Sequence, residues 1–374
     1  MLVLTGARLF DGATFVDDHA IVIGGGRIRG ITRHAERPRG GMQRDLEGGL
    51  IAPGFVDIQV NGGGGALFNA DPTVETVRRI AEAHRRFGTT SMLPTCVTDA
   101  PEVQQAAIDA AREARERVPG VLGIHLEGPF LDVARKGAHL ARFIREMTIA
   151  DVETIAAADC GTVLVTLAPN RAPPALIREL ASRGVLVSLG HSDATHAQAL
   201  AALEAGAGAF THLFNAMSPM TGREPGMVGA ALSDPLSYVG VIADGYHVHD
   251  ANLRIAFAAK PRERFMLISD AMPPAADGPD PFELMGRQVT RLGGRLQLED
   301  GTLAGSLLTM DEALRYCVAR LGVDLADALR MASRVPATFL KRGHDLGRIA
   351  PGYLANLVHL DDSLRVRETW IEGR

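Results

Sequence analysis

The feature that most constrains the fold of this chain is a regular alternation of strand-like and helix-like patterns from Pro53 to Asp270. Eight short apolar runs fit buried strands: FVDIQV, TTSMLPT, VLGIHLEG, TVLVTLA, VLVSLG, AFTHLF, YVGVIAD and FMLISD. Amphipathic segments of helical period separate most of these runs, whereas the connection from Ser218 to Ser237 is irregular and favours only a short helix. Eight buried strands with helical crossovers predict an α/β fold of the TIM-like (β/α)8 barrel type.

The two ends of the chain have a different pattern. The first fifty residues and the last thirty or so contain short apolar and polar alternations between glycine clusters, which favour small β-strands. We therefore expect a small β-sandwich domain built from residues 1–52 plus 340–374, beside a barrel domain of residues 53–339. A doubly wound open sheet is the alternative for the centre, but no glycine-rich dinucleotide fingerprint opens a βαβ unit.

Charge and cysteine content argue against several kinds of partner. The formal net charge of −5 provides no basic footprint for nucleic acid. No apolar run is long enough to cross a bilayer, and the N-terminus has no signal-peptide pattern. The three cysteines, Cys96, Cys160 and Cys317, lie far apart, as expected for reduced thiols. We therefore expect a cytoplasmic protein with a small-molecule substrate and no nucleic-acid or membrane partner.

Ionisable residues stand at the ends of several predicted strands, which is where barrels of this type gather their functional groups. Glu127, His191 and His212 end the third, fifth and sixth strand patterns. One carboxylate and two imidazoles are a natural ligand set for a catalytic zinc ion, which keeps a further position open for water. The alternatives are a salt-bridged strand end for the glutamate and hydrogen-bonded core or turn positions for the two histidines.

Asp270 ends the eighth strand pattern, in the segment ISDAM. Beside a water activated by a metal, this carboxylate would act as general base and later pass the proton to a leaving group. A helix N-cap is the alternative role for an aspartate at this place. His125 shares a strand face with Glu127, and we expect it to support the site or pack in the barrel interior.

Several motifs are similar to those of one known family: APGFVDIQVNGGGG, HLEGPFL, KGAH, LGHSDA, THLFNAM, DGYHVH, ISDAM, LAGS and PGYLANLVHLD. Together they resemble the amidohydrolase superfamily and, more closely, its N-acetylglucosamine-6-phosphate deacetylase family, over nearly the whole chain. The resemblance implies hydrolysis of the N-acetyl group of N-acetylglucosamine 6-phosphate to glucosamine 6-phosphate and acetate. It also implies one divalent metal per subunit, Zn²⁺ with Fe²⁺ as the alternative.

The resemblance also assigns roles to individual residues. Glu127, His191 and His212 would hold the metal, Asp270 would be the catalytic acid and base, and His139 would stabilise the developing oxyanion. Contacts to the substrate would come from Ala138, His139, Asn215, Ala216, Arg223, Asp244, Gly245, Tyr246, His247, Leu303, Ala304 and Gly305.

Four of these residues would bind the phosphate, with Asn215 and Ala216 donating from the backbone and His247 and Arg223 from their side chains. Arginine suits a phosphate because its planar fork donates two parallel hydrogen bonds. In the family this arginine reaches into the site of the neighbouring subunit. The resemblance therefore implies a homodimer in which Arg223 acts across the interface.

Gln59 and Asn61 depart from the His-x-His pair with which many amidohydrolases hold a second metal. Neutral amides are poor zinc ligands compared with imidazole, so we predict a single metal that is coordinated without help from this strand. Two rival functions stay open. One is an amidohydrolase that acts on another acylated amino sugar or on a cyclic amide, and the other is a non-catalytic scaffold with this fold.

Overall fold

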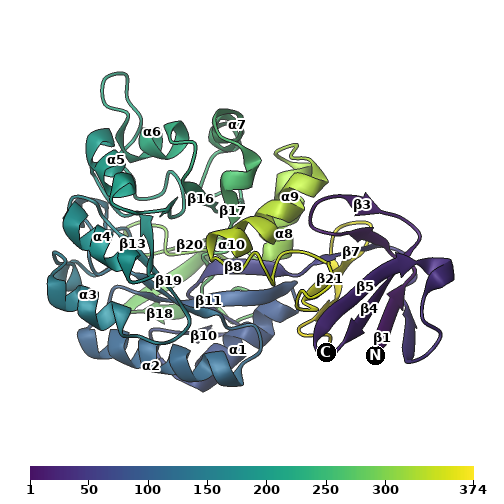
Figure 1. Cartoon of the computed structure of the whole chain (residues 1–374). Helices are drawn as coiled ribbons and strands as arrows, with labels where there is room; N and C mark the ends of the chain where they lie inside the picture. The colour runs from purple at the N-terminus through teal and green to yellow at the C-terminus, as the bar shows by residue number, and fades with distance from the viewer.

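The computed structural model describes residues 1–374, and a barrel of eight parallel strands forms its centre (Figure 1). Neighbouring strands pair in chain order. The strands are β8 (Phe55–Val60), β11 (Thr89–Val97), β12 (Gly123–Glu127), β13 (Thr162–Leu167), β14 (Leu186–Leu189), β15 (Ala209–Phe210), β16 (Tyr238–Val241) and β17 (Phe265–Leu267). The predicted (β/α)8 architecture is confirmed, because each of these strand patterns became one strand of a single parallel sheet.

The first and last strands close the barrel without a regular ladder between them. Asp270 N donates to Gln59 O at 2.9 Å, Asn61 N donates to Ala271 O at 3.0 Å, and an isolated bridge joins Val60 to Ala271. We call this contact, formed by residues 57–62 and 269–271, the seam. The seam therefore lacks the continuous backbone ladder that joins the other neighbouring strands.

Helices surround the barrel and follow most of its strands (Figure 1). They are α1 (Val74–Arg85), α2 (Pro101–Arg117), α3 (Ile149–Ala156), α4 (Pro174–Ser182), α5 (His196–Glu204), α6 (Gly226–Ser233), α7 (Asp250–Ala259), α8 (Met310–Ala319), α9 (Leu325–Ala332) and α10 (Arg334–Phe339). The irregular link between Ser218 and Ser237 contains only the short α6, as predicted. No helix has the length and apolar character needed to span a membrane.

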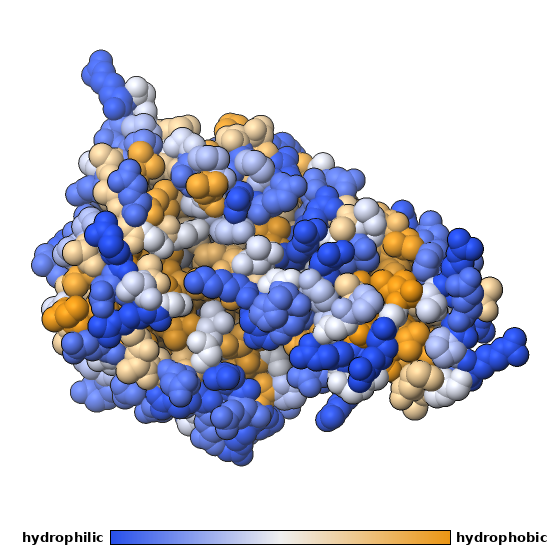
Figure 2. Space-filling model, viewed as in Figure 1, coloured by the Kyte–Doolittle hydropathy of each residue, from blue (hydrophilic) through white to orange (hydrophobic).

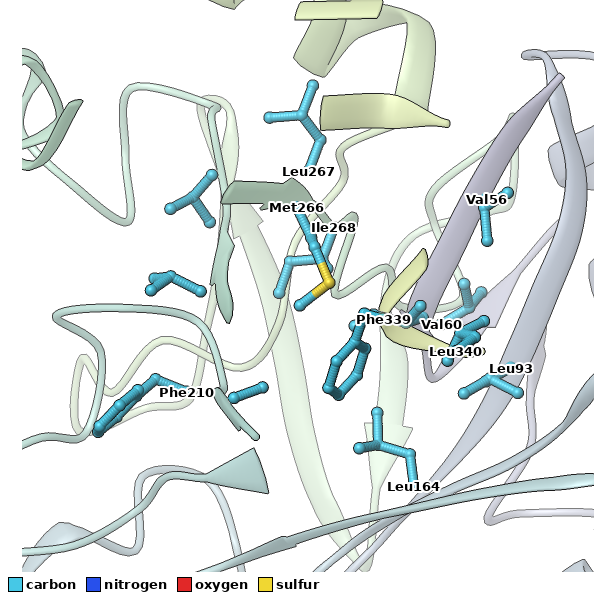
Figure 3. Close-up of a cluster of buried hydrophobic side chains, with 14 of the residues drawn as sticks. Val56, Val60, Leu93, Leu164, Phe210, Met266, Leu267, Ile268, Phe339 and Leu340 are labelled. Carbon is cyan, nitrogen blue, oxygen red and sulfur yellow. The ribbon is translucent and has the colours of Figure 1, made fainter. Parts of the chain in front are cut away.

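Apolar side chains from strands and helices form one large core of 86 buried residues. Figure 3 shows part of this core, where Leu93 of β11, Met266 of β17 and Phe339 of α10 gather near one another. Hydrophilic residues cover much of the molecular face in Figure 2, and hydrophobic residues are visible toward the middle of the barrel. This core holds the strand ends at fixed positions, which the site requires.

The two ends of the chain form two small sheets beside the barrel (Figure 1). One sheet contains β5 (Arg27–Arg33), β4 (His19–Gly24), β1 (Leu2–Thr5) and β6 (Met42–Asp45), and the other contains β22 (Val366–Trp370), β21 (Leu357–Leu360), β7 (Leu50–Pro53), β2 (Arg8–Phe10) and β3 (Phe15–Val16). Leu4, Ile23, Leu357 and Trp370 share a separate core of 11 buried residues. Residues from both termini therefore pack together, while the exact domain boundaries stay a prediction.

A third small element lies over the barrel after β17. It is a three-stranded antiparallel sheet of β18 (Phe282–Leu284), β19 (Arg287–Leu292) and β20 (Arg295–Gln297), which we call the flap. Leu284, Val289 and Leu296 of the flap pack with Met272 in a core of seven buried residues. A further pair, β9 (Gly62–Gly63) and β10 (Ala66–Leu67), follows β8.

Candidate active site

Three predicted metal ligands, from three different strand ends, meet at one point. Glu127 Oε1 lies 3.2 Å from His191 Nε2 and 3.0 Å from His212 Nε2, and the two Nε2 atoms are 3.0 Å apart. All three residues are buried. A zinc ion about 2.0–2.1 Å from each of its tetrahedral ligands separates those ligands by about 3.3 Å. The three atoms therefore have nearly the spacing that such an ion requires.

The electrostatics of this cluster favour a cation. Burial alone would raise the pKa of Glu127, yet hydrogen bonds from His191 and His212 bring it well below its ordinary value. Burial would likewise lower the pKa of His212, but the hydrogen bond and charge of Glu127 raise it. A buried carboxylate that stays ionised between two imidazoles is a natural site for a divalent metal.

His139 also joins this cluster, since single ligand atoms of Glu127, His139 and His191 lie within 4.8 Å of one another. Hydrogen bonds distinguish His139 from His191. His191 Nδ1 is 2.9 Å from Arg135 O, so in the neutral ring the proton lies on Nδ1 and Nε2 can bind a metal in place of its contact with Glu127. His139 Nδ1 accepts from Thr98 N at 3.3 Å, so its proton lies on Nε2. His139 therefore presents a donor rather than a ligand.

Burial and the neighbouring His191 lower the pKa of His139 to about 3, so its imidazole is neutral at physiological pH. A neutral imidazole with a proton on Nε2 can donate a hydrogen bond to a substrate carbonyl. This geometry supports the predicted oxyanion role of His139.

Asp270 lies just beyond β17 and accepts two hydrogen bonds at Oδ1. Asn61 Nδ2 donates at 2.7 Å and Gln59 Nε2 at 3.2 Å, and Gln59 Nε2 also lies 3.1 Å from Glu127 Oε1. Carboxylates only accept, so both amides direct their N–H groups toward them. Gln59 and Asn61 therefore act as donors in this arrangement. Burial, followed by the charge of Glu127, raises the pKa of Asp270 to about 6, which suits a general base near neutral pH.

The backbone at these strand ends has an unusual conformation. His191, His212 and Asp270 have φ angles of 47°, 35° and 52°, in the left-handed region that few non-glycine residues adopt. Such positions cost about 1–3 kcal/mol each and persist where the surroundings hold them. Here all three residues line one cavity. No feature of the sequence indicated these φ angles.

The cluster opens into a cavity of about 380 Å³ above the barrel. Seven of the predicted substrate residues line it, and they are Ala138, His139, Asn215, Ala216, His247, Leu303 and Gly305. Glu127, His191, His212, Asp270 and Asn61 line the same cavity. The structure thus brings the predicted metal ligands, the predicted base and most predicted substrate contacts into one space.

Five predicted substrate residues lie elsewhere. Asp244 and Tyr246 line a neighbouring cavity of about 650 Å³, and Gly245 lies between them beside Tyr316. Ala304 is fully buried in the core of the flap. Arg223 is exposed on the loop before α6, outside the cavity of its own chain. Direct contacts of these five residues with a substrate stay predictions.

Asp244 contacts the cavity through His247. Asp244 Oδ2 lies 2.6 Å from His247 Nδ1, and Oδ1 accepts from the backbone N–H groups of Tyr246 and His247. Burial opposes ionisation, but the bond to His247 lowers the pKa of Asp244 overall. Since Nδ1 is engaged, Nε2 is the free ring nitrogen of His247.

The backbone after β15 offers one free donor. Asn215 N donates to His212 O at 3.0 Å, so this N–H is already engaged within the turn. Ala216 N has no partner among the hydrogen bonds of the structure, and Ala216 lines the cavity. Of the two backbone donors expected for the phosphate, Ala216 is therefore the one available.

The residues that line the flap side of the cavity were not predicted from the sequence. Leu284 and Met285 of the flap line it, together with Arg135 and Thr302. Arg287 Nη2 of the flap donates to Ala138 O, next to His139. The pattern of residues 286–306, GRQVTRLGGRLQLEDGTLAGS, favours a β-hairpin, but nothing in the sequence indicates which loop the flap touches.

Comparisons with known proteins define the class of this protein. The model of the Amidohydrolase family matches residues 50–374, and the model of the NagA composite domain matches residues 1–51. The chain belongs to the amidohydrolase family, and the resemblance inferred from its motifs is confirmed. It is an enzyme of the hydrolase class.

Its relatives carry closely related names. The chain is 44% identical to an N-acetylgalactosamine-6-phosphate deacetylase of Shewanella sp. (strain ANA-3), over 100% of this chain and 95% of the relative. It is 34% identical to an N-acetylglucosamine-6-phosphate deacetylase of Haemophilus influenzae, over 96% of this chain and 94% of the relative. The structure of N-acetylglucosamine-6-phosphate deacetylase from Pasteurella multocida superposes with a TM-score of 0.96 at 34% identity, covering 100% of this chain and 98% of that one.

Proposed function

We propose that this protein hydrolyses the N-acetyl group of N-acetylglucosamine 6-phosphate to glucosamine 6-phosphate and acetate. The observation that carries the proposal is the approach of Asp270 to the Glu127, His191 and His212 cluster, in a cavity that also contains His139 and His247. The names of the relatives support the substrate class, a phosphorylated amino sugar with an N-acetyl group.

Glu127, His191 and His212 would hold one divalent metal, which we propose to be Zn²⁺, with Fe²⁺ as the alternative. Two nitrogen donors and one carboxylate oxygen suit either ion, and the ionised state of Glu127 agrees with a cation at this place. When bound, such a metal polarises the amide carbonyl and lowers the pKa of water. Gln59 and Asn61 direct donors toward Asp270, which supports a single metal.

The protein's own groups would carry the protons. Asp270 takes a proton from the attacking water and later gives it to the leaving amine, as a base with a pKa near neutrality can do. His139 donates its Nε2–H to the oxygen on which negative charge develops. Asn61 and Gln59 hold the Asp270 carboxylate in place while it is ionised.

The phosphate would lie against His247 and the free N–H of Ala216, both in the cavity wall. The contact of Asp244 Oδ2 with His247 Nδ1 orients the ring, so that Nε2 is the nitrogen left to face the phosphate. We further propose that the protein is a homodimer in which Arg223, exposed here, completes the phosphate site of the other subunit. We also propose a cytoplasmic location, with which its three buried free cysteines agree.

N-acetylgalactosamine 6-phosphate is a second candidate substrate, because two relatives at 44% and 38% identity bear that name. The two sugars differ only in the configuration at C4. Acetate release from both epimers and from their unphosphorylated analogues, with metal content measured on the same sample, tests the proposal. Comparable kcat/KM with and without phosphate would contradict the proposed substrate class. If the metal-loaded protein releases acetate from none of these four sugars, the result would favour the alternative of a non-catalytic scaffold.

A further inference from the structure

The barrel contains a buried carboxylate that the proposed mechanism does not use. Asp57, on β8, has a relative exposure of 0%. Its Oδ1 accepts from the backbone N–H of Gln59 at 3.2 Å and from that of Ser269 at 3.3 Å. Ser269 directly precedes Asp270, so the carboxyl group of Asp57 contacts the segment that presents the proposed base.

We propose that Asp57 is a positioning residue for Asp270. Its Oδ1 takes the place of a backbone acceptor at the seam, where β8 and β17 lack a regular ladder, and so fixes the Ser269–Asp270 backbone. This inference rests on the proposed role of Asp270 as the general base. In this role Asp57 contacts neither substrate nor metal.

The backbone at Asp270 needs such support because its φ angle is 52°. Four other contacts hold the segment: Asp270 N and Ser269 Oγ donate to Gln59 O at 2.9 and 3.2 Å, Ser306 N donates to Asp270 O at 2.8 Å, and Ser306 Oγ donates to Ser269 O at 2.6 Å. None of them engages Ser269 N, whose acceptor is Asp57. Removing that acceptor would leave a buried N–H without a partner and take away one of the contacts that hold the segment against β8.

The oxygen of Asp57, rather than its charge, is the feature that positions Asp270. Burial raises the pKa of Asp57 to about 7, so the neutral form is well populated at physiological pH. Asparagine keeps an oxygen acceptor at the same place without the charge, whereas alanine has none. The pair of variants D57N and D57A therefore separates the acceptor from the charge.

Steady-state kinetics of metal-loaded wild type, D57N and D57A, with acetate release as readout, test the inference. We expect D57A to lose about 100-fold in kcat, because a displacement of about 1 Å at a catalytic group has an effect of this size. The KM of D57A should stay within about threefold of the wild-type value, since the variant leaves the substrate contacts in place. D57N should keep kcat within about threefold of wild type. V56A, which removes buried volume from the same strand without touching the seam hydrogen bonds, should keep wild-type kcat.

Unaltered kcat in D57A, or a loss in D57N as large as in D57A, would overturn the inference. If D57A does not fold, D57N decides alone, and a loss beyond about tenfold contradicts the role of the acceptor. Crystal structures of the variants give a readout without activity: we expect the Asp270 carboxylate to leave Asn61 in D57A and to keep this contact in D57N. Absence of deacetylase activity in wild type would refute the proposed function, whereas an unmoved Asp270 in D57A would refute this inference separately.

Discussion

Asn61 Nδ2 donates to Asp270 Oδ1 at 2.7 Å, which joins residues 209 positions apart in the chain. The contact crosses the seam, from the first barrel strand to the last. It places a neutral amide, instead of an imidazole, against the proposed base. Burial and the charge of Glu127 raise the pKa of Asp270, and the hydrogen bond from Asn61 partly opposes them.

The rate should fall on the acid side as Asp270 becomes protonated. The pKa of Asp270 is raised to about 6, and the carboxylate form is the active one, so kcat should be constant above this value and decrease below it. A bound cation would favour the carboxylate form and move the acid limb of the pH profile to lower pH. N61L removes a donor to the carboxylate and should move the limb to higher pH. The kcat–pH profiles of both proteins check this, with N252A on α7 as a control expected to match wild type.

Removing a proposed metal ligand should remove both metal and activity. Removing a residue that only supports a metal ligand costs about 10–100-fold in affinity or activity, so H191A, H212A and E127Q, which remove ligands themselves, should each lose more than about 100-fold in kcat/KM. Metal per subunit should fall in parallel in elemental analysis. H344A changes a histidine with a side-chain exposure of 71%, and it should retain the metal. Full metal content in H191A and H212A would refute this ligand set.

Loss of metal should also lower the stability of the folded protein. A ligand that binds only the native state stabilises it by about 2.7 kcal/mol at a concentration 100 times its Kd. Dialysis against a chelator should therefore lower the Tm, and returning one equivalent of Zn²⁺ per subunit should restore it. An identical Tm before and after chelation, with the metal shown to be removed, would contradict the proposed site.

Asp244 should affect phosphate recognition rather than the chemical step. D244N weakens the support of His247, and a hydrogen bond to a charged group contributes about 1.5–3 kcal/mol, or about 10–100-fold. We expect KM for the phosphorylated sugar to rise by about this factor, with little change for the unphosphorylated analogue. Equal effects on the two substrates would mean that Asp244 does not act through the phosphate.

Arg287 should hold the flap over the cavity. Its guanidinium donates to Ala138 O, and R287A leaves this carbonyl without that partner, which costs about 1–3 kcal/mol if the oxygen stays buried. We expect kcat/KM to fall by about tenfold and amide exchange in residues 282–297 to accelerate. R291A is the matched control on the same strand, because Arg291 has a side-chain exposure of 50% and contacts Asp280 and Gly293 O rather than Ala138. Equal behaviour of the two variants would argue against a flap anchor at Arg287.

Much of the architecture was predictable because it depends on local patterns. Each apolar run that ends in an ionisable residue, such as the one before Glu127 or Asp270, became a barrel strand with that residue at its carboxyl end. In a parallel barrel these ends lie on one face whatever the loops do. The predicted approach of Glu127, His191 and His212 followed from this rule, and the structure brings these residues within 3.2 Å.

The positions of loop residues were less predictable. Asp244 was expected against the sugar; in the structure its carboxylate contacts the ring of His247 in the turn after β16, and a direct contact with the sugar stays a prediction. The backbone N–H of Asn215 was expected at the phosphate, but it closes a turn with His212 O. Such outcomes depend on the exact path of a few residues, which no periodic pattern encodes.

By itself the sequence determined the order of strands and helices, the class of chemistry and the residues able to perform it. These properties follow from side-chain type and from spacing over a few residues. Only the tertiary structure decided how those residues are held: Asp57 against Ser269, Asn61 against Asp270, and Arg287 against Ala138. These pairs are 149 to 212 positions apart, so their contacts exist only after the barrel has closed and the flap has packed on it.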